Sequence, residues 1–557
     1  MTKRQHWPSS ANEGISQREA SLTSRNTAFV LLMLVVIAGT LFRLYRLGER
    51  SLYVDEAASV IFARLPWSAF WKAMWDHEAN MAFYYVLLRG WIHLGDSETV
   101  VRSLSVLFGV ATIPATYLLG LRLFGRTAGL LSAALLAVHA FHIQYSQEAR
   151  SYSLLLFLLV LSTYFFLRSV DSPDNKVNWI AYVLFSALAV YAQVFALLVL
   201  IAQWLSLGFS KLRQIGMAKI SLIVGTFALL VTPMALFLVL KNRGQIEWIP
   251  RPTIRSLIDF SYLLTGNGGK PLLLAYTAFC VVALSQLARS EGPKLPSFDV
   301  PWPVRLTALW LVFPIASTFS VSFIKPVFWD RYLVICVPAL VLLAGQGMAK
   351  LDRLSALPRG FASLPLIVMI GLSLWGWNRH DNGFSSGQPW QADWRLVTRY
   401  ILARQQSGDA AFFYRASGSR AFTYYVHREL LRQSATSSPV VVFPPDVGST
   451  ENFNLEPGSE QTNLATRGYK RVWLVLYHYE GLQRREAAAA AIQAALREKF
   501  CLCEQEVFPG ANGSITVSLY VGALDTAKSG ANGEGNSEPA NAHCSLEASG
   551  SPKTGQR

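Results

Sequence analysis

The feature that most constrains this chain is a series of apolar blocks, each roughly 18 to 25 residues long, between residues 27 and 377. A helix of about 20 residues is long enough to cross the roughly 30 Å hydrocarbon layer of a bilayer. Of the 557 residues, 52% are hydrophobic and only 15% are charged, against about 25% charged in a typical soluble domain. The sequence therefore predicts an α-helical polytopic membrane protein and excludes a soluble enzyme and a disordered chain.

The blocks predict about eleven transmembrane helices. The apolar block at 80–95 is too short to span and carries Arg89 and His93 on one helical face, so we expect it to lie along the membrane interface. The clusters of Lys and Arg then fall on the same side as the basic N-terminus, which the positive-inside rule makes cytoplasmic. This predicts a multi-pass protein of the plasma or inner membrane. The predicted spans begin near residues 27, 101, 127, 152, 178, 194, 219, 271, 304, 331 and 359.

Four regions follow from this pattern. Residues 1–26 form a cytoplasmic segment, and residues 27–380 form the membrane domain, whose first outer loop covers residues 48–100. Residues 384–525 alternate helical and strand patterns, which predicts an extracytoplasmic α/β domain with a largely parallel sheet. Residues 526–557 are rich in Gly, Ser, Asn and Ala, so we expect a disordered tail. In the α/β domain we expect helices over 393–406, 420–431 and 485–499, and strands over 410–414, 439–443, 472–477 and 514–521.

The charge and the cysteines exclude other classes. The net charge of +15 arises mainly at the ends of apolar blocks, with no basic segment interleaved with exposed aromatics, so we expect no nucleic-acid partner. Cys501 and Cys503 form a C-x-C pair without further ligands at zinc spacing, which argues against a metal site. A disulfide from Cys544 to one of this pair stays open if the region is exported.

Polar clusters mark the outer ends of the predicted spans. The adjacent acids Asp55 and Glu56 follow the first span at the start of a predicted helix, where capping and catalysis are both open and mutually compatible. A second cluster, with Glu148 and Arg150, closes the third span, and local ion pairing is its alternative role. A third cluster, residues 325–332, carries two cations and an acid, with binding of lipid headgroups as the alternative.

These clusters belong to a series of motifs that resembles the GT-C membrane glycosyltransferases, in particular the branch of protein O-mannosyltransferases and lipid A aminoarabinose transferases. The motifs occur in the family's order over most of residues 30–350. Where the family has His-Pro-Pro, this chain keeps His77 but has Glu78 and Ala79 next, which places the rigid turn in doubt. The motifs are S-L-Y-V-D-E at 51–56, H-E-A-N-M-A-F-Y-Y at 77–85, R-S-L-S-V-L-F-G at 102–109, L-R-L-F-G at 121–125, Y-S-Q-E-A-R at 145–150 and R-Y at 331–332.

The resemblance implies the GT-C fold and the transfer of a sugar from a polyprenyl phosphate donor to an acceptor on the extracytoplasmic face. Asp55 is then the general base, Glu56 orients it or shapes the site, and Glu148 is the second acid. No cofactor is obligatory and no metal motif is present, although the three acids could hold a divalent cation if they converge. The other residues assigned by the resemblance are Arg150, Arg331 and Lys325 for the donor phosphate, and His77, Tyr84 and Tyr332 for the substrates.

The sugar and the acceptor stay open, and protein, lipid and polysaccharide acceptors all fit the same polar residues. Two other classes of function compete with the transferase. A transporter or flippase of polyprenyl-linked lipid predicts inverted repeats and charged residues at mid-membrane, whereas these acids lie at one face. A scaffold that only displays the outer domain would need no acids at Asp55 and Glu148.

Overall fold

The computed structural model divides the chain into two compact units. The first comprises Met1–Glu49 and Met74–Asp381, and the second comprises Arg50–Ala73 and Asn382–Arg557. The structure describes residues 10–241, 249–285, 300–354, 363–381, 392–414, 416–432, 437–444, 458–477, 483–510 and 513–522.

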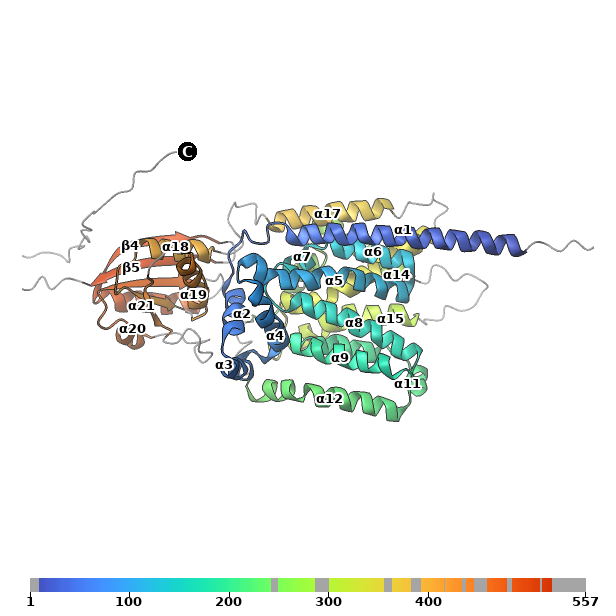
Figure 1. Cartoon of the computed structure of the whole chain (residues 1–557), viewed down its shortest axis with the longest axis horizontal. Helices are drawn as coiled ribbons and strands as arrows, with labels where there is room; N and C mark the ends of the chain where they lie inside the picture. The colour runs from blue at the N-terminus through green and yellow to red at the C-terminus, as the bar shows by residue number, and fades with distance from the viewer. Residues whose placement is uncertain are drawn as a thin grey trace, which may run out of the picture. The chain divides into compact units, whose positions relative to one another are not determined.

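The first unit is all helical, and its long helices run side by side (Figure 1). The elements are α1 (Ser10–Leu44), η1 (Met74–Glu78), η2 (Ala79–Met81), α4 (Ala82–Trp91), η3 (Ile92–Leu94), α5 (Glu98–Phe124), α6 (Arg126–Ala137), α7 (Ala140–Ser146), α8 (Tyr152–Asp171), α9 (Lys176–Ala192), α10 (Ala196–Leu205), α11 (Phe209–Ile215), α12 (Met217–Leu240), α13 (Ile254–Leu264), α14 (Gly269–Leu284), α15 (Trp302–Val321), η4 (Asp330–Cys336), α16 (Val337–Leu354) and α17 (Ser363–Asp381).

Within the described residues, 6 helices are long and apolar enough to cross a membrane, and up to 8 spans result if two bent pairs each count as one. The bent pairs are α6 with α7, at 62°, and α13 with α14, at 82°. The shorter apolar helices α9, α10 and α17 coincide with further predicted spans. The predicted total of eleven therefore stays a prediction. Helix α4, in the block predicted to lie at the interface, has only 10 residues and is too short to span.

Close helix packing in this unit depends on small residues, as is usual between membrane helices. Gly120 of α5 faces Gly129 of α6, and a Cβ added at Gly120 would lie 2.8 Å from the Gly129 Cα. At the crossing of α14 and α16, a Cβ on Gly347 would lie 1.9 Å from the backbone oxygen of Phe279. A backbone carbonyl cannot rotate away as a side chain can, so only glycine fits at Gly347.

We expect Gly347→Ala to destabilise the membrane unit by about 1–3 kcal/mol or more, because helices α14 and α16 must separate to relieve the overlap. Gly225→Ala is the matched control, since Gly225 lies within α12 and has nothing within 4 Å of an added Cβ. That change should be neutral or stabilising by up to about 1 kcal/mol. The unfolding midpoint of each variant in detergent measures the difference. Equal midpoints for the two variants would contradict the packing described here.

The second unit combines helices with a five-stranded sheet. It contains two helices from the first outer loop, α2 and α3, as well as the C-terminal elements. The elements are α2 (Val54–Arg64), α3 (Trp67–Ala73), α18 (Trp394–Arg404), β1 (Ala410–Tyr414), α19 (Ala416–Leu431), β2 (Val440–Phe443), α20 (Ser459–Ala465), β3 (Arg471–Tyr477), α21 (Gln483–Arg497), β4 (Phe500–Phe508) and β5 (Ile515–Gly522). The α/β class expected from the sequence is confirmed.

The strand order is β2-β1-β3-β5-β4. Strand β1 is parallel to β2 and β3, whereas β5 is antiparallel to both β3 and β4. The largely parallel sheet predicted from the sequence is therefore wrong for half of the sheet. Strand β4 was not predicted, and a connection of only six residues, 509–514, joins it to β5. Such a short connection permits only an antiparallel pair.

The sheet is covered on both faces, which explains why all five residues of β1 are buried. Phe412 stacks on Phe443, with ring centroids 4.9 Å apart, in the core that includes Ile492 and Leu496 of α21. Phe413 points to the opposite face and packs on Phe422 of α19, at 5.1 Å. Alternate residues of a strand point to opposite faces, so β1 contributes to two helix-covered cores.

The predicted domain boundaries stay a prediction, and the compact units add one fact to them: residues Arg50–Ala73 group with the C-terminal segment. This range lies within the outer loop predicted at 48–100. Cys501 is a free cysteine, so it takes no part in the disulfide that the sequence left open. Cys544 and the tail at 526–557 lie outside the described residues.

Candidate active site

Asp55 and Glu56 lie in the first turn of α2, in the second unit. Glu56 is fully buried, and its Oε2 accepts a hydrogen bond from the backbone N–H of Tyr53 at 3.3 Å. This satisfies one of the donors that a helix start leaves open. Asp55 is half-buried, and its backbone oxygen accepts the Ser59 hydroxyl at 2.9 Å. Capping and catalysis were both open for the acidic pair, and Glu56 is a residue that caps α2.

In the first unit, the turn that carries Glu148 and Arg150 is hydrogen-bonded to the end of α1. The side-chain amide of Gln147 donates to the backbone oxygens of Phe42, Arg43 and Tyr45, at 3.3, 3.2 and 2.8 Å. The last carbonyls of a helix have no partner within the helix, so this amide caps α1. Gln147 is thus structural, while Glu148 and Arg150 follow it directly in the chain.

Arg43 fixes the same turn from the other direction. Its side chain is fully buried and donates to the carbonyls of Gly39, Leu136 and Ala137 at 2.8, 3.2 and 3.0 Å. The guanidinium also donates to His142 Nδ1 at 2.6 Å and to the Ser146 hydroxyl at 3.3 Å. Leu136 and Ala137 end α6 at its bend with α7. Arg43 therefore caps the broken helix that leads into residues 147–150.

Arg150 is buried and belongs to a chain of polar contacts with the segment after His77. Its Nη1 donates to the hydroxyl of Tyr85 at 3.0 Å, and that hydroxyl donates to Glu78 Oε2 at 3.0 Å. The carbonyl of Arg150 accepts the hydroxyl of Ser105 at 3.1 Å, and Ser105 also meets the hydroxyl of Tyr84 at 2.9 Å. Tyr84, predicted to contact substrate, is fully buried in this packing.

Glu148 and Arg331, distant in sequence, converge in the first unit. Glu148 is half-buried and accepts from Gln144 at 3.4 Å. The hydroxyl of Tyr145 interacts electrostatically with Asp330, Glu148, Tyr152 and Arg331. The backbone N–H of Arg331 donates to Asp330 Oδ1 at 2.7 Å in η4. The turn before α8 and the start of η4 therefore form one polar cluster of acids and a cation around a tyrosine.

Tyr332 extends this cluster with an aromatic surface. Its ring is half-buried and stacks on Phe195, with centroids 4.6 Å apart and an interplanar angle of 21°. Phe195 lies at the junction of α9 and α10. The neighbouring backbone N–H of Val194 donates to Asn80 Oδ1 at 2.7 Å. The junction thus connects the Tyr332 segment with the motif that begins at His77.

The segment around His77 is held by side-chain contacts. The family that this chain resembles has prolines there. His77 lies in the π-helical turn η1. Asp76 pairs with Lys241 at 2.9 Å, Glu78 accepts from Tyr85, and Asn80 accepts from Val194. Through this ion pair and these hydrogen bonds, residues 76–80 contact the end of α12, α4 and the junction of α9 and α10. The segment is therefore fixed by tertiary contacts instead of proline rings.

The predicted site residues divide between the two units. Asp55 and Glu56 belong to the second unit, and all others belong to the first. Within the first unit, Glu148 and Arg331 both interact electrostatically with Tyr145, while Lys325 is exposed in the turn after α15. The sequence reasoning missed Glu78, Tyr85 and Asp330. Asp330 stands beside Arg331 in the sequence, but the role of Tyr85 follows only from its contact with Arg150.

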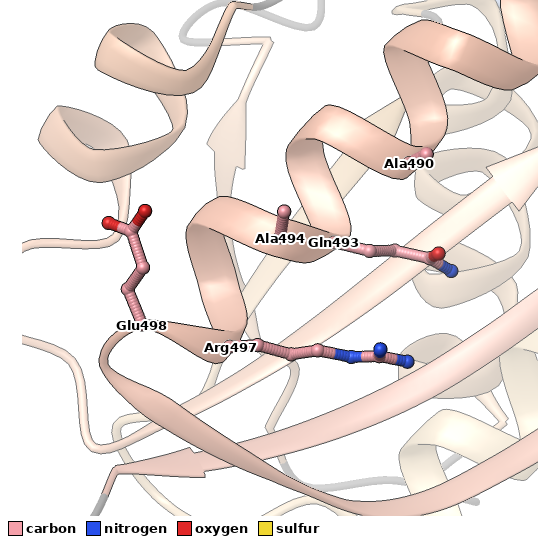
Figure 2. A pocket seen from close by; sticks show the side chains of 5 residues that line it. All are labelled: Ala490, Gln493, Ala494, Arg497 and Glu498. Atoms are coloured by element: carbon pink, nitrogen blue, oxygen red, sulfur yellow. The ribbon is translucent and has the colours of Figure 1, made fainter.

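Within the described part of the chain, no group of three or more His, Cys, Asp or Glu residues could hold a metal ion. The pocket in Figure 2 lies on a different part of the protein, along one side of α21. The side chains of Gln493 and Arg497 extend from that helix. The short side chains of the neighbouring alanines leave a shallow hollow beside them. None of the predicted site residues lines this pocket, so it has no part in the candidate active site.

We expect Tyr85→Phe to lower the transfer rate about tenfold while costing only about 1 kcal/mol of stability, because the change removes one hydroxyl between Arg150 and Glu78. Tyr191→Phe is the matched control, since the Tyr191 hydroxyl donates to the carbonyl of Leu230 at 2.9 Å, between α9 and α12. Initial rates at saturating donor compare the two variants. A rate equal to that of the control would show that the Tyr85 hydroxyl has no part in the reaction.

This chain is similar to known proteins in part of its sequence and in its fold. The family model of dolichyl-phosphate-mannose-protein mannosyltransferases matches residues 79–237, which include the turn at 147–150. The crystal structure of ArnT from Cupriavidus metallidurans in the apo state shares the fold, with a TM-score of 0.54 and 14% sequence identity. That match covers 89% of this chain and 98% of ArnT. The chain therefore shares the fold of ArnT, and its residues 79–237 resemble the mannosyltransferase family.

Further matches support this fold. ArnT bound to undecaprenyl phosphate matches with a TM-score of 0.52 and 12% identity, over 87% of this chain and 97% of ArnT. The Archaeoglobus fulgidus oligosaccharyltransferase, in a complex with Zn and sulfate, matches with a TM-score of 0.52 and 10% identity. This match covers 85% of the present chain and 71% of the oligosaccharyltransferase chain. No curated protein matches the sequence significantly. The apolar helices and these matches together indicate a multi-pass membrane protein.

Proposed function

We propose that the protein transfers a sugar from a polyprenyl phosphate donor to an acceptor hydroxyl on the extracytoplasmic face. The observation that carries the proposal is the cluster of Glu148, Asp330 and Arg331 around Tyr145, with Arg150 linked to Glu78 beside it in the chain. Acids and arginines gathered in this way suit a substrate that carries both a phosphate and sugar hydroxyls. The ArnT structure with bound undecaprenyl phosphate supports a donor of this class.

In the proposed reaction, Asp55 accepts the proton of the acceptor hydroxyl. The acceptor oxygen forms a bond to the anomeric carbon, and the bond from that carbon to the phosphate oxygen breaks. The polyprenyl phosphate leaves with its bonding electrons, and Arg331 and Arg150 compensate its charge. One displacement without a covalent intermediate inverts the anomeric centre. Lys325 is exposed and serves the phosphate as a point charge at the surface.

The remaining polar groups have supporting tasks. Glu148 hydrogen-bonds to the sugar or the acceptor, Tyr332 offers its half-buried ring, and His77 contacts a substrate from the turn η1. The bias of Lys and Arg along the chain supports a cytoplasmic N-terminus and an extracytoplasmic C-terminal domain. The proposal includes no obligatory metal. The acceptor is a protein, a lipid or a polysaccharide.

The test uses the purified full chain with radiolabelled polyprenyl phosphate sugars and a membrane extract as acceptor. We expect label to move to an acceptor while an equal amount of polyprenyl phosphate is released, and the labelled product then identifies the acceptor. A parallel reaction with a chelator measures metal dependence. Movement of unchanged donor lipid across a vesicle, without any released polyprenyl phosphate, would replace the transferase with a flippase.

A further inference from the structure

Helix α2, which carries Asp55, packs on α19 of the C-terminal α/β domain within the second unit. The backbone N–H of Leu52 donates to the hydroxyl of Tyr425 at 2.6 Å. Leu52 and Tyr425 are 0% and 1% exposed, so this hydrogen bond is shielded from water. Leu52 stands directly before Tyr53, the N-cap of α2. The hydroxyl of Tyr425 therefore fixes the backbone where α2 begins.

Arginine–aromatic contacts fix the other end of α2. The guanidinium of Arg420, on α19, lies over the ring of Phe62 at 5.4 Å from its centroid. In the reverse direction, Arg64 at the end of α2 lies over the ring of Tyr424 at 6.0 Å. Phe62, Tyr424 and Arg420 are all nearly fully buried, which strengthens such contacts.

Together these contacts hold α2 at both ends. The bond at Leu52 and the cap at Glu56 satisfy consecutive backbone donors, so the first turn cannot rotate without breaking buried hydrogen bonds. The contacts at Phe62 and Arg64 prevent the helix from tilting about that first turn. Asp55 lies between them, on the turn whose orientation α19 determines. A catalytic carboxylate requires this kind of support, because displacements of about 1 Å can cost about a hundredfold in rate.

We propose that Tyr425 and Arg420 are positioning residues for Asp55, and that the C-terminal domain is part of the catalytic machinery because α19 holds α2. This inference rests on the proposed function, in which Asp55 is the base. It assigns the C-terminal domain the task of orienting the helix that carries the proposed base. Tyr425 and Arg420 act through α2 and need not touch substrate.

The test is Tyr425→Phe in the full chain, with Tyr400→Phe as a matched control. The hydroxyl of Tyr400 donates to Glu504 Oε1 at 2.6 Å, in the same domain but in contact with β4 instead of α2. Burial and this hydrogen bond raise the pKa of Tyr400, so its phenol stays a donor at neutral pH. Each variant loses one tyrosine hydroxyl and one short hydrogen bond. They differ in whether the lost bond holds the start of α2.

We expect Tyr425→Phe to lower kcat by about tenfold to a hundredfold with the donor KM unchanged, whereas Tyr400→Phe keeps the wild-type kcat. A purely structural role would lower the unfolding midpoint and the amount of active protein without this selective loss in kcat per folded molecule. Wild-type kcat in Tyr425→Phe would overturn the inference. So would a rise in donor KM with unchanged kcat, which would indicate a direct contribution to donor binding.

A second variant covers the case in which Tyr425→Phe does not fold. Phe62→Leu removes the ring beneath Arg420 but keeps an apolar side chain on α2, and we expect the same selective loss in kcat. Asp55→Asn, measured in the same assay, separates this inference from the proposed function. If Asp55→Asn stays active, the proposed base is wrong. If Asp55→Asn is inactive while Tyr425→Phe and Phe62→Leu are both fully active, only the positioning role fails.

Discussion

Asp55→Asn should lower kcat for sugar transfer by about 10²–10⁴-fold, the usual contribution of a general base. Asparagine has the shape of aspartate but cannot accept the proton of the acceptor hydroxyl. Because Glu56 accepts the backbone N–H of Tyr53 at the start of α2 and asparagine has nearly the shape of aspartate, the substitution should change the helix and the unfolding midpoint little. The donor KM should also stay within about twofold, since the proposed phosphate contacts come from arginines.

Two variants control this experiment. Asp171→Asn makes the same chemical change at an exposed acid that pairs with Arg122 at 2.8 Å, and it should retain wild-type kcat because exposed ion pairs contribute at most about 1 kcal/mol. Glu56→Gln alters the buried cap, so it should clearly lower the unfolding midpoint and change kcat only slightly. Transfer by Asp55→Asn at more than half the wild-type rate would remove Asp55 from the role of base.

Arg43→Met should destabilise the membrane unit by at least about 3 kcal/mol and abolish most transfer activity. Arg43 has five N–H donors, and each meets a buried acceptor on α1, α6 or α7. Methionine keeps an apolar stem of similar length but leaves the carbonyls of Leu136 and Ala137 without this donor. An orphaned buried polar group costs about 1–3 kcal/mol, and more than one is created. The bend that leads to Glu148 and Arg150 should then lose its fixed geometry.

Arg46→Met is the matched control for Arg43→Met. Arg46 lies three residues further along, with a side chain 43% exposed, and it pairs with Glu49 at the surface. Loss of that pair should change the unfolding midpoint little. Unfolding midpoints in detergent and transfer rates of the folded fraction give the comparison. A midpoint for Arg43→Met equal to that of Arg46→Met would show that the buried guanidinium network does not hold the bend.

Much of the fold could be predicted from the sequence, because the signals for it are local. Apolar blocks longer than about 18 residues specify membrane helices wherever they occur. In the C-terminal domain, a short continuous run of apolar residues predicted the strand at Ala410–Tyr414 with the observed bounds. Strand β4 escaped prediction because it is an edge strand with the sequence F-C-L-C-E-Q-E-V-F, whose middle is polar and partly exposed. Its position also decided that the sheet is mixed.

The candidate site could be predicted only in part. The acidic pair at Asp55 and Glu56 and the Q-E-A-R turn are visible in the sequence because residue type and order are enough to match a family. The tasks within these motifs are different: Glu56 caps α2 and Gln147 caps α1. Capping depends on which backbone groups at a helix end lack a hydrogen-bond partner and lie near the side chain. The sequence does not show which helix end that is.

The sequence by itself determined that this chain is a helical membrane protein with an α/β domain, and it determined which residues are candidates for the chemistry. Only the tertiary structure decided how those residues are held. The contact of Leu52 with Tyr425 joins positions 373 residues apart, and that of Arg43 with His142 joins positions 99 apart. Hydropathy and periodicity report on neighbours along the chain. Hydrogen bonds between distant segments depend on the packing of whole helices, which brings these groups within bonding distance only after the chain has folded.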